Sequence, residues 1–289
     1  MTNITKGAEV QKLLDKAAGL TVEGGDARLK GIVRDLTEAV MLVIEKYDVN
    51  EGEFWTALNF LQEGAPEYGL IAPGLGLEHF LDLKMDAEDA EQGVHGGTPR
   101  TIEGPLFVEG APMNEGEATM NAAGDPGDPL TVHGIVKGPD GAPVAGAIVD
   151  AWHANAKGLY SHFDPSQPAF NNRVKIKTGP DGRYVVRTFK PVGYAVPPGG
   201  ASERLLGAIG RHGMRPAHVH LMVRAEGFRP LTTQINLSYD PIVYDDFAFG
   251  TRDGLVPDIT DGANGSEIAF DLELVAGAPK LSTRPRAAA

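Results

Sequence analysis

The chain has 289 residues, 42% of them hydrophobic, and 39 acidic against 26 basic side chains give it a formal net charge of −13. It contains no cysteine, which excludes disulfides, zinc fingers and iron–sulfur clusters, so any bound metal must have nitrogen and oxygen ligands. A surface this acidic repels phosphate backbones, and no apolar run approaches the roughly 20 residues of a membrane-spanning helix. Residues 1–19 lack a secretion signal. We therefore expect a cytoplasmic protein that binds no nucleic acid and spans no membrane.

The chain up to about residue 95 has the periodicity of helices. Between Asp26 and Tyr47, apolar residues recur every three or four positions and form one face of a helix. Shorter stretches at residues 10–17 and 51–62 repeat this pattern. Because these helices are too few and too amphipathic to close a core alone, we expect them to pack on the rest of the chain or on a second copy of it.

The sequence changes in character after Gly96, where Gly and Pro become frequent and short β-branched and aromatic runs alternate with turns. The Pro-Asp-Gly sequences at residues 139–141 and 180–182 predict turns, because Pro presets φ and Gly permits a positive φ. We expect an α+β fold, with an N-terminal helical domain over residues 1–98 and an antiparallel β-sandwich domain over residues 99–289. Strands are predicted at Tyr184–Phe189, His218–Arg224 and Leu231–Leu237.

The most informative short motif is Arg215-Pro216-Ala217-His218-Val219-His220. Residues two apart on a strand point to the same face, so His218 and His220 can bind one metal ion together, although such a pair is as often structural. None of the other six histidines has a partner at i+2 or i+4. His153 is the best rival, and its expected role is that of a half-buried histidine with satisfied hydrogen bonds.

Two ways of completing a metal site stay open from the residues alone. A carboxylate beside the histidine pair would give a non-haem iron(II) site, although no Asp or Glu stands at a motif-like distance. Tyr160 and Tyr194 lie in Gly- and Pro-flanked loops, where functional residues concentrate. A phenol titrates near pH ~10, so binding as phenolate needs a hard, strongly charged metal such as iron(III). Each tyrosine alone fits better as a packed residue with a satisfied hydroxyl.

Several segments taken together resemble the intradiol ring-cleavage dioxygenases, and within them the catechol 1,2-dioxygenases. The resemblance extends over nearly the whole chain. It is densest in five segments, residues 101–106, 150–160, 211–220, 231–236 and 244–249.

This resemblance implies that one iron(III) ion is held by Tyr160, Tyr194, His218 and His220. It implies that a catechol is cleaved by O2 between its two hydroxyl groups to give cis,cis-muconate. It further implies that the N-terminal helices form a homodimer, often with a phospholipid between the helices.

The same resemblance implies roles for three residues around the metal. Tyr194 is a ligand that leaves the metal and accepts a substrate proton. Arg215 stabilises charge that develops on the ring, and Gln234 forms hydrogen bonds near the anionic substrate. From the residues alone, Arg215 also fits a surface arginine paired with a carboxylate, and Gln234 an ordinary polar residue on a strand.

The substrate pocket that the resemblance implies has an apolar wall suited to a flat ring, although apolar residues are more often simply core. Its residues are Leu70, Pro73, Ile102, Pro105, Leu106, Phe247 and Ala248. Pro73 stands where chlorocatechol and hydroxyquinol enzymes tend to carry an acid, which favours catechol or methylcatechol. Phe107 stands where catechol enzymes usually have tyrosine, so a chlorocatechol or hydroxyquinol 1,2-dioxygenase stays open as the alternative.

A function of another class is also open. Residues 134–149 resemble the strands of transthyretin-like or carbohydrate-binding sandwich modules, which bind without catalysis. Such a module needs no set of tyrosines and histidines and has no colour, whereas tyrosinate bound to iron(III) makes a protein red to burgundy.

Overall fold

The computed structural model describes residues 3–120 and 126–277. The chain forms two compact units, Met1–Ala65 and Pro66–Ala289. The domain boundary expected between residues 98 and 99 stays a prediction. The first residues of the predicted N-terminal domain and the last residues of the predicted C-terminal domain lie outside the described residues. Within the described ranges, no helix combines the length and apolar character needed to cross a membrane.

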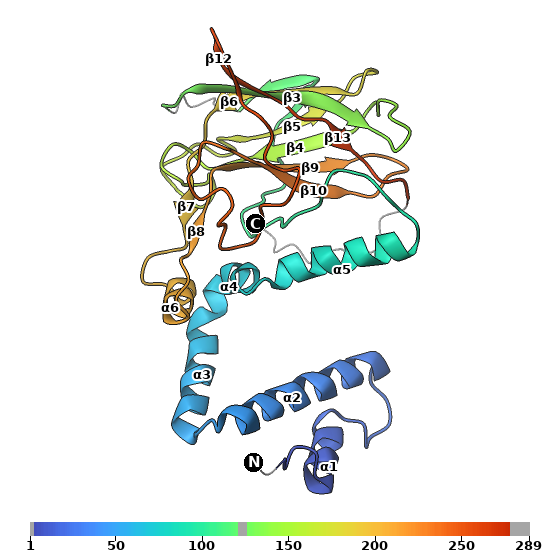
Figure 1. The fold of residues 1–289 in the computed structure, drawn as a ribbon, viewed down its shortest axis with the longest axis vertical. Coiled ribbons are helices and arrows are strands. Elements are labelled where there is room, and N and C mark those ends of the chain that lie inside the picture. Colours follow the sequence, from blue (N-terminus) through green and yellow to red (C-terminus); the bar gives the residue numbers. More distant parts are fainter. Residues whose placement is uncertain (1–2, 121–125, 278–289) are drawn as a thin grey trace. The chain divides into compact units, whose positions relative to one another are not determined.

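The first unit contains the three helices that the periodicity predicts, α1 (Ala8–Ala17), α2 (Ala27–Tyr47) and α3 (Glu51–Gly64) (Figure 1). Asp26 caps α2, because its carboxylate accepts a hydrogen bond from the Leu29 N–H at 2.7 Å. Asn50 and Glu53 form a reciprocal capping box at the start of α3. Caps and periodicity therefore agree, and the helical prediction is confirmed.

Helix α2 has one polar side toward α1 and one apolar side that the other two helices of this unit leave exposed. On the polar side, Arg34 pairs with Asp15 at 2.7 Å and Glu38 accepts a hydrogen bond from Lys6 at 2.8 Å. No residue of α2 is buried. Between 45% and 65% of the surface is exposed for each of Leu29, Ile32, Leu36, Val40 and Val43. We call these five residues the α2 apolar face.

The second unit contains the helices α4 (Tyr68–Gly74), α5 (Leu77–Glu91) and α6 (Ala201–Ala208). Ion pairs bind α5 to arginines outside the helix. Asp86 pairs with Arg100 and Arg252, and Asp89 pairs with Arg100 and Arg229. The sequence analysis does not predict α6, because its eight residues make only about two turns inside a segment rich in Gly and Pro.

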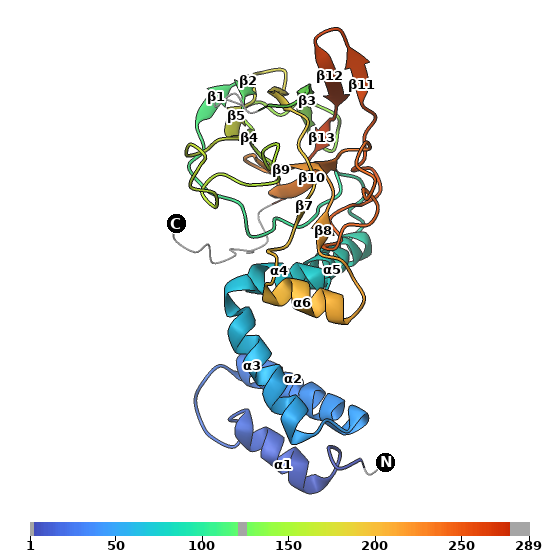
Figure 2. The same cartoon turned by 90° about the vertical axis from the view of Figure 1, so that its left-hand side faces the viewer.

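The rest of the second unit is a β-sandwich, and Figure 2 shows its two sheets stacked on each other. The first sheet has the order β1 (Met113–Glu115), β5 (Arg173–Lys177), β4 (Ile148–Trp152), β9 (His218–Arg224), β10 (Leu231–Asn236). The second has the order β11 (Thr260–Gly262), β12 (Gly265–Ala269), β3 (Pro129–Lys137), β6 (Arg183–Phe189), β2 (Glu117–Thr119), with β13 (Leu272–Glu273) also on β3. A two-stranded ribbon joins β7 (Tyr194–Ala195) to β8 (Met214–Arg215). Side chains of both sheets, such as Val132, Val149, Val186 and Leu221, form one buried core.

The predicted helices followed by a β-sandwich are confirmed, and so are all three predicted strands. The sheets are mixed, however, where the sequence analysis expects antiparallel ones. The central pairs β3–β6, β4–β5, β4–β9 and β9–β10 are antiparallel. The parallel pairs are β1–β5, β2–β6, β12–β3 and β13–β3, and the two strands of each pair lie far apart in the sequence, so no hairpin can join them.

We predict that Asp82→Asn stabilises the protein above about pH 6. Asp82 is a buried residue of α5 whose Oδ2 accepts no hydrogen bond, and burial raises the pKa of its carboxyl to about 6. The folded state therefore holds this proton more tightly than the unfolded chain, so the residue costs stability as pH rises from about 4 through 6. Removing the charge should raise the free energy of unfolding at pH 8 by about 1–3 kcal/mol, measured in urea.

Asp89→Asn is the matched control on the same helix. Asp89 is also buried, but two arginines pair with it and its pKa is lowered. Its loss should decrease the free energy of unfolding at pH 8. A decrease of similar size for Asp82→Asn would contradict the prediction.

Candidate active site

One loop and two strands bring the four predicted metal ligands together. Tyr160 lies in the loop after β4, Tyr194 begins β7, and His218 and His220 lie on β9. The Tyr160 hydroxyl oxygen is 3.5 Å from His218 Nε2, which is 3.0 Å from His220 Nε2. The ring centroid of Tyr194 is 5.5 Å from that of Tyr160 and 5.7 Å from that of His218. Tyr194 is half-buried, and the other three side chains are buried.

Glycines allow the two tyrosine loops to approach each other. A Cβ atom on Gly158 would lie 3.0 Å from Tyr194 Cβ, and the φ of Gly158 is +77°, which other residues rarely adopt. A Cβ atom on Gly193 would lie 2.6 Å from the carbonyl oxygen of Arg215. A larger side chain at Gly158 would push the Tyr160 loop away from Tyr194, and one at Gly193 would push Tyr194 away from the backbone of Arg215.

The burial of the two histidines leaves both rings neutral, and their Nε2 atoms face each other. Nδ1–H of His218 donates to the Pro216 carbonyl oxygen at 2.7 Å, which assigns the lone pair to Nε2. The His220 ring stacks on Trp152 with a centroid distance of 4.6 Å and an interplanar angle of 7°. Burial lowers the pKa of His218 to about 3 and that of His220 well below its ordinary value. Both rings are therefore available as neutral ligands.

This donor set fits a small, highly charged cation. Two nitrogen ligands that are each about 2.1 Å from one metal ion, with an N–metal–N angle of about 90°, lie about 3.0 Å apart. His218 Nε2 and His220 Nε2 have this separation. Burial raises the pKa of Tyr160 well above its ordinary value, so a phenolate there needs strong positive charge beside it. In the parts of the chain that the structure describes, no His, Asp or Glu completes a three-membered metal-binding group, which argues against a two-histidine, one-carboxylate site.

His153, the other candidate metal ligand among the histidines, has a structural role. It is 1% exposed, so it is buried more deeply than the sequence analysis expects. Its Nδ1 lies 2.6 Å from the Ala154 carbonyl oxygen and its Nε2 lies 2.6 Å from the Thr188 hydroxyl. Both ring nitrogens are thus satisfied, as predicted.

Arg215 is buried beside the histidine pair and is not a surface residue. Its Nη1 donates to His218 Nε2 at 3.1 Å, and its Nη2 donates to Gln234 Oε1 at 2.9 Å. Its Nε and Nη2 donate to the carboxylate of Asp246 at 3.1 and 2.8 Å. Arg215 is therefore not a surface arginine, although it does pair with a carboxylate, and both Arg215 and Gln234, which lies on β10, adjoin the four-residue cluster.

The sequence does not predict Asp246 as a functional residue, although this residue lies in the segment 244–249 that carries part of the resemblance. Besides Arg215, the carboxylate accepts hydrogen bonds from the backbone N–H groups of Ala248 at 3.0 Å and Gly250 at 3.1 Å. Burial alone would raise its pKa, but the charge and hydrogen bonds of Arg215 hold the pKa below its ordinary value. A Cβ atom on Gly250 would collide with Arg215 Nη2, so this position requires glycine. Asp246 therefore links the arginine to the loop that follows it.

The predicted pocket wall forms contacts in three groups. Ile102, Phe247 and Ala248 share a buried cluster with Val196 and Leu206. Leu106 and Phe107 pack with Trp152, Tyr160 and Tyr194. On α4, Pro73 is buried and Leu70 half-buried, and Pro105 lies against Gly69, where an added Cβ would be 2.9 Å from Pro105 Cβ.

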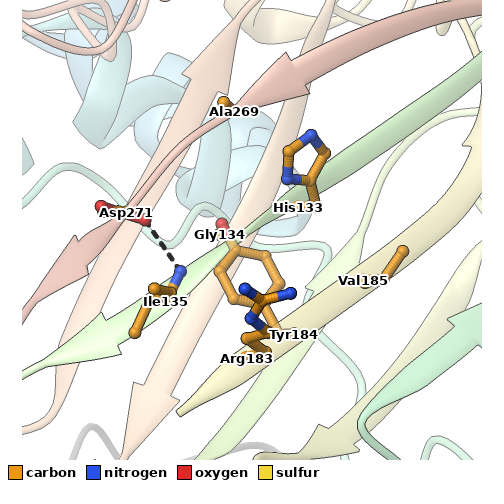
Figure 3. Close-up of a pocket in the computed structure, with 8 residues that line it drawn as sticks. All are labelled: His133, Gly134, Ile135, Arg183, Tyr184, Val185, Ala269 and Asp271. Atoms are coloured by element: carbon orange, nitrogen blue, oxygen red, sulfur yellow. Dashed lines mark hydrogen bonds between the residues drawn. The ribbon is translucent and has the colours of Figure 1, made fainter. Parts of the chain in front are cut away.

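A pocket on the second sheet is a separate feature (Figure 3). It is lined by His133, Gly134, Ile135, Arg183, Tyr184, Val185, Ala269 and Asp271, none of which belongs to the cluster above. Asp271 accepts a hydrogen bond from the Ile135 N–H at 2.9 Å, and the Tyr184 hydroxyl donates to the Phe270 carbonyl at 2.6 Å. These polar groups are satisfied within the fold.

Comparison with known proteins gives matches along most of the chain. Residues 102–276 match the family model described as Dioxygenase, and residues 26–93 match the one described as Catechol dioxygenase N terminus. Catechol 1,2-dioxygenase 2 of Acinetobacter lwoffii is 53% identical over 250 residues, which are 86% of this chain and 91% of that protein. The structure of wild-type catechol 1,2-dioxygenase from Acinetobacter radioresistens superposes with a TM-score of 0.92 at 43% identity, covering 97% of each chain. A chlorocatechol 1,2-dioxygenase of Pseudomonas putida is 36% identical over 252 residues, 86% of this chain and 94% of that protein.

We predict that Asp246→Asn destabilises the protein by about 3–5 kcal/mol, because it leaves the buried guanidinium of Arg215 without a counter-charge. The free energy of unfolding in urea at pH 7 measures this loss. Asp245→Asn removes a neighbouring carboxylate that is 78% exposed and pairs with His212, so it should change stability by less than about 0.5 kcal/mol. Equal effects of the two substitutions would show that the Arg215 pair has no special weight.

Proposed function

The chain belongs to the intradiol ring-cleavage dioxygenase family, and from this premise we propose that it cleaves catechol with O2 to cis,cis-muconate. Both atoms of O2 enter the product, so no other reductant is consumed. The observation that carries the proposal is the buried cluster of Tyr160, His218 and His220, which has the Tyr194 ring beside it and adjoins Arg215. A non-catalytic sandwich module would have no use for this set.

The cofactor of this proposal is iron(III), held by Tyr160, Tyr194, His218 and His220. The facing Nε2 atoms, the neutral histidines and the phenol oxygens support a hard trivalent ion. When bound, iron(III) supplies Lewis acidity that draws electron density from the catechol oxygens and prepares the ring for attack by O2. The residues around it prepare the substrate for that step.

The two tyrosines have different roles in the proposal. Tyr160 is 4% exposed and packs with Trp152 and Met222, so it is the permanent ligand. Tyr194 is half-buried and begins a strand of two residues, so its side chain has more freedom to move. Tyr194 would therefore be the ligand that gives way to catechol, and its phenolate would accept the proton of one catechol hydroxyl.

Arg215 places a positive charge where negative charge develops on the ring. Its guanidinium is held on one side by Asp246 and on another by Gln234, which fixes it beside His218 before substrate arrives. Gln234 in turn donates to Asn236 Oδ1 at 2.6 Å, so its amide orientation is set. The apolar wall keeps water from competing for these groups.

The preferred substrate in this proposal is catechol, with chlorocatechol or hydroxyquinol as the alternative on the same chemistry. The identity of 53% to a catechol enzyme against 36% to a chlorocatechol enzyme supports this order, as does the apolar Pro73. The pocket is formed by Leu70, Pro73, Ile102, Pro105, Leu106, Phe247, Ala248 and Arg215.

The proposal includes a homodimer formed through the N-terminal helices, with a phospholipid as a further occupant of the same surface. It is supported by the α2 apolar face, because five adjoining aliphatic side chains left in water are costly unless a second surface covers them. The cytoplasmic location stays a prediction.

We predict that the iron-loaded protein converts catechol to cis,cis-muconate without yellow semialdehyde. Tyr160→Phe should lose iron or weaken and shift the visible charge-transfer band, because only the Tyr194 phenolate is left, and it should lose at least about 99% of kcat. Absorption spectra, iron content and the product spectrum measure these outcomes. Tyr244→Phe is the matched control, since Tyr244 is 80% exposed. A Tyr160→Phe protein with full colour and activity would rule this residue out as a ligand.

For the dimer, we predict that Leu36→Glu shifts the protein from dimer to monomer in sedimentation velocity at micromolar concentration. Leu36 is 65% exposed at the centre of the α2 apolar face, and a buried charge there costs several kcal/mol. The control is Asp35→Asn. The Asp35 side chain is next to Leu36 in the sequence and is 81% exposed, so this substitution should leave the dimer intact. A wild-type protein that sediments as a monomer would refute the dimer.

A further inference from the structure

The short helix α4 carries two proposed pocket residues, Leu70 and Pro73, yet it has little means of holding its own position. Its seven residues make about two turns, which is below the length at which helices are stable alone, and Pro73 removes one backbone donor. The place of these residues in the pocket therefore depends on what holds the ends of α4.

At its N-terminal end, α4 is bound to α6 through Glu67. The carboxylate accepts hydrogen bonds from the N–H groups of Ala201 at 3.0 Å and Ser202 at 2.9 Å, and from the Ser202 hydroxyl. These donors are the free N–H groups of the first turn of α6, whose dipole favours a negative charge. Gly200 makes room, because a Cβ atom there would collide with the carboxylate.

At its C-terminal end, α4 is bound by Arg211, which lies three residues after the end of α6. One guanidinium nitrogen donates to the Gly74 carbonyl at the end of α4, and the other donates to the Phe247 carbonyl at 2.9 Å. The guanidinium also lies over the Phe249 ring, 4.7 Å from its centroid. One side chain thus joins α4 to the loop that forms the opposite part of the pocket wall.

The packing between these two bonds is tight. A Cβ atom on Gly74 would lie 3.3 Å from the Phe247 ring and 3.6 Å from Leu206 of α6. Leu206 belongs to the same buried cluster as Phe247, Ala248 and Ile102. The segment of residues 200–211 therefore fixes the spacing between α4 and the Phe247–Ala248 loop.

We propose that Arg211 is a specificity-determining positioning residue, which sets the width of the ring pocket by holding α4 against the Phe247–Ala248 loop. The proposal rests on the proposed ring-cleaving function. Arg211 touches neither the ligand cluster nor the reacting atoms in this assignment; it acts through Pro73 and Phe247. A rigid wall rejects an added ring substituent by steric contact, and a loosened wall gives up that discrimination.

The test compares Arg211→Met, which keeps length but loses both donors, with Arg211→Lys, which keeps one donor and the charge. In Arg211→Met, KM for catechol should rise about 10-fold while kcat changes by less than about 3-fold, and the preference for catechol over 4-chlorocatechol in kcat/KM should fall about 10-fold. Arg211→Lys should give intermediate values. Glu67→Gln, at the other end of α4, should shift both quantities in the same direction. The charge-transfer band should stay unchanged in all three.

The matched control is Arg183→Met, because Arg183 is 72% exposed on β6 and pairs with Asp181. Hydrogen–deuterium exchange of residues 68–76 is the readout that needs no activity, and it should be faster in Arg211→Met than in the control. This readout separates the two proposals if the wild-type protein cleaves no catechol. If Arg211→Met changes neither the hydrogen–deuterium exchange nor the selectivity, the assignment is overturned. It is also overturned if Arg211→Met lowers kcat and thermal stability while KM and selectivity stay the same. If Arg211→Met does not fold, the Lys and Glu67→Gln variants decide by the same measurements.

Discussion

The buried ion pair between Arg215 and Asp246 is the interaction on which the candidate site depends. Its two charges are 4% and 1% exposed at the side chain, so neither is solvated and each needs the other. Through Arg215 the pair contacts the histidine cluster and Gln234; through Asp246 it fixes the backbone of the loop that carries Phe247 and Ala248. One pair therefore sets the electrostatics beside the two histidines and the backbone conformation of the loop that carries Phe247 and Ala248.

Much of the architecture could be predicted because it follows from local rules. The helix over residues 27–47 has a capping Asp26 and an apolar period, and the Pro-Asp-Gly turns place Gly141 and Gly182 at positive φ. His218 and His220 share a face because a strand has a period of two. That they hold iron(III) with the two tyrosines is a proposal that comes from the resemblance, and the geometry supports it.

The rest could not be predicted, because it depends on contacts between residues far apart in the sequence. Asp246 is 31 residues from Arg215, and nothing in its own segment marks it as a buried counter-ion. Glu67 is 135 residues from the hydroxyl of Ser202 that it binds. The parallel strands that widen both sheets likewise depend on where long connections return. Periodicity carries no information about such pairings.

Strand β9 has a further consequence for how this scaffold can change. His218, His220 and Met222 point to one side, while Val219, Leu221 and Val223 point to the core between the sheets. Inserting or deleting a single residue would exchange the two sets, turning imidazoles into the hydrocarbon interior and aliphatic chains toward the tyrosines. The length of this strand is therefore constrained twice, by the histidine cluster on one face and by the core on the other. Insertions and deletions that change the substrate are expected in the loops, because strand pairing does not fix their lengths.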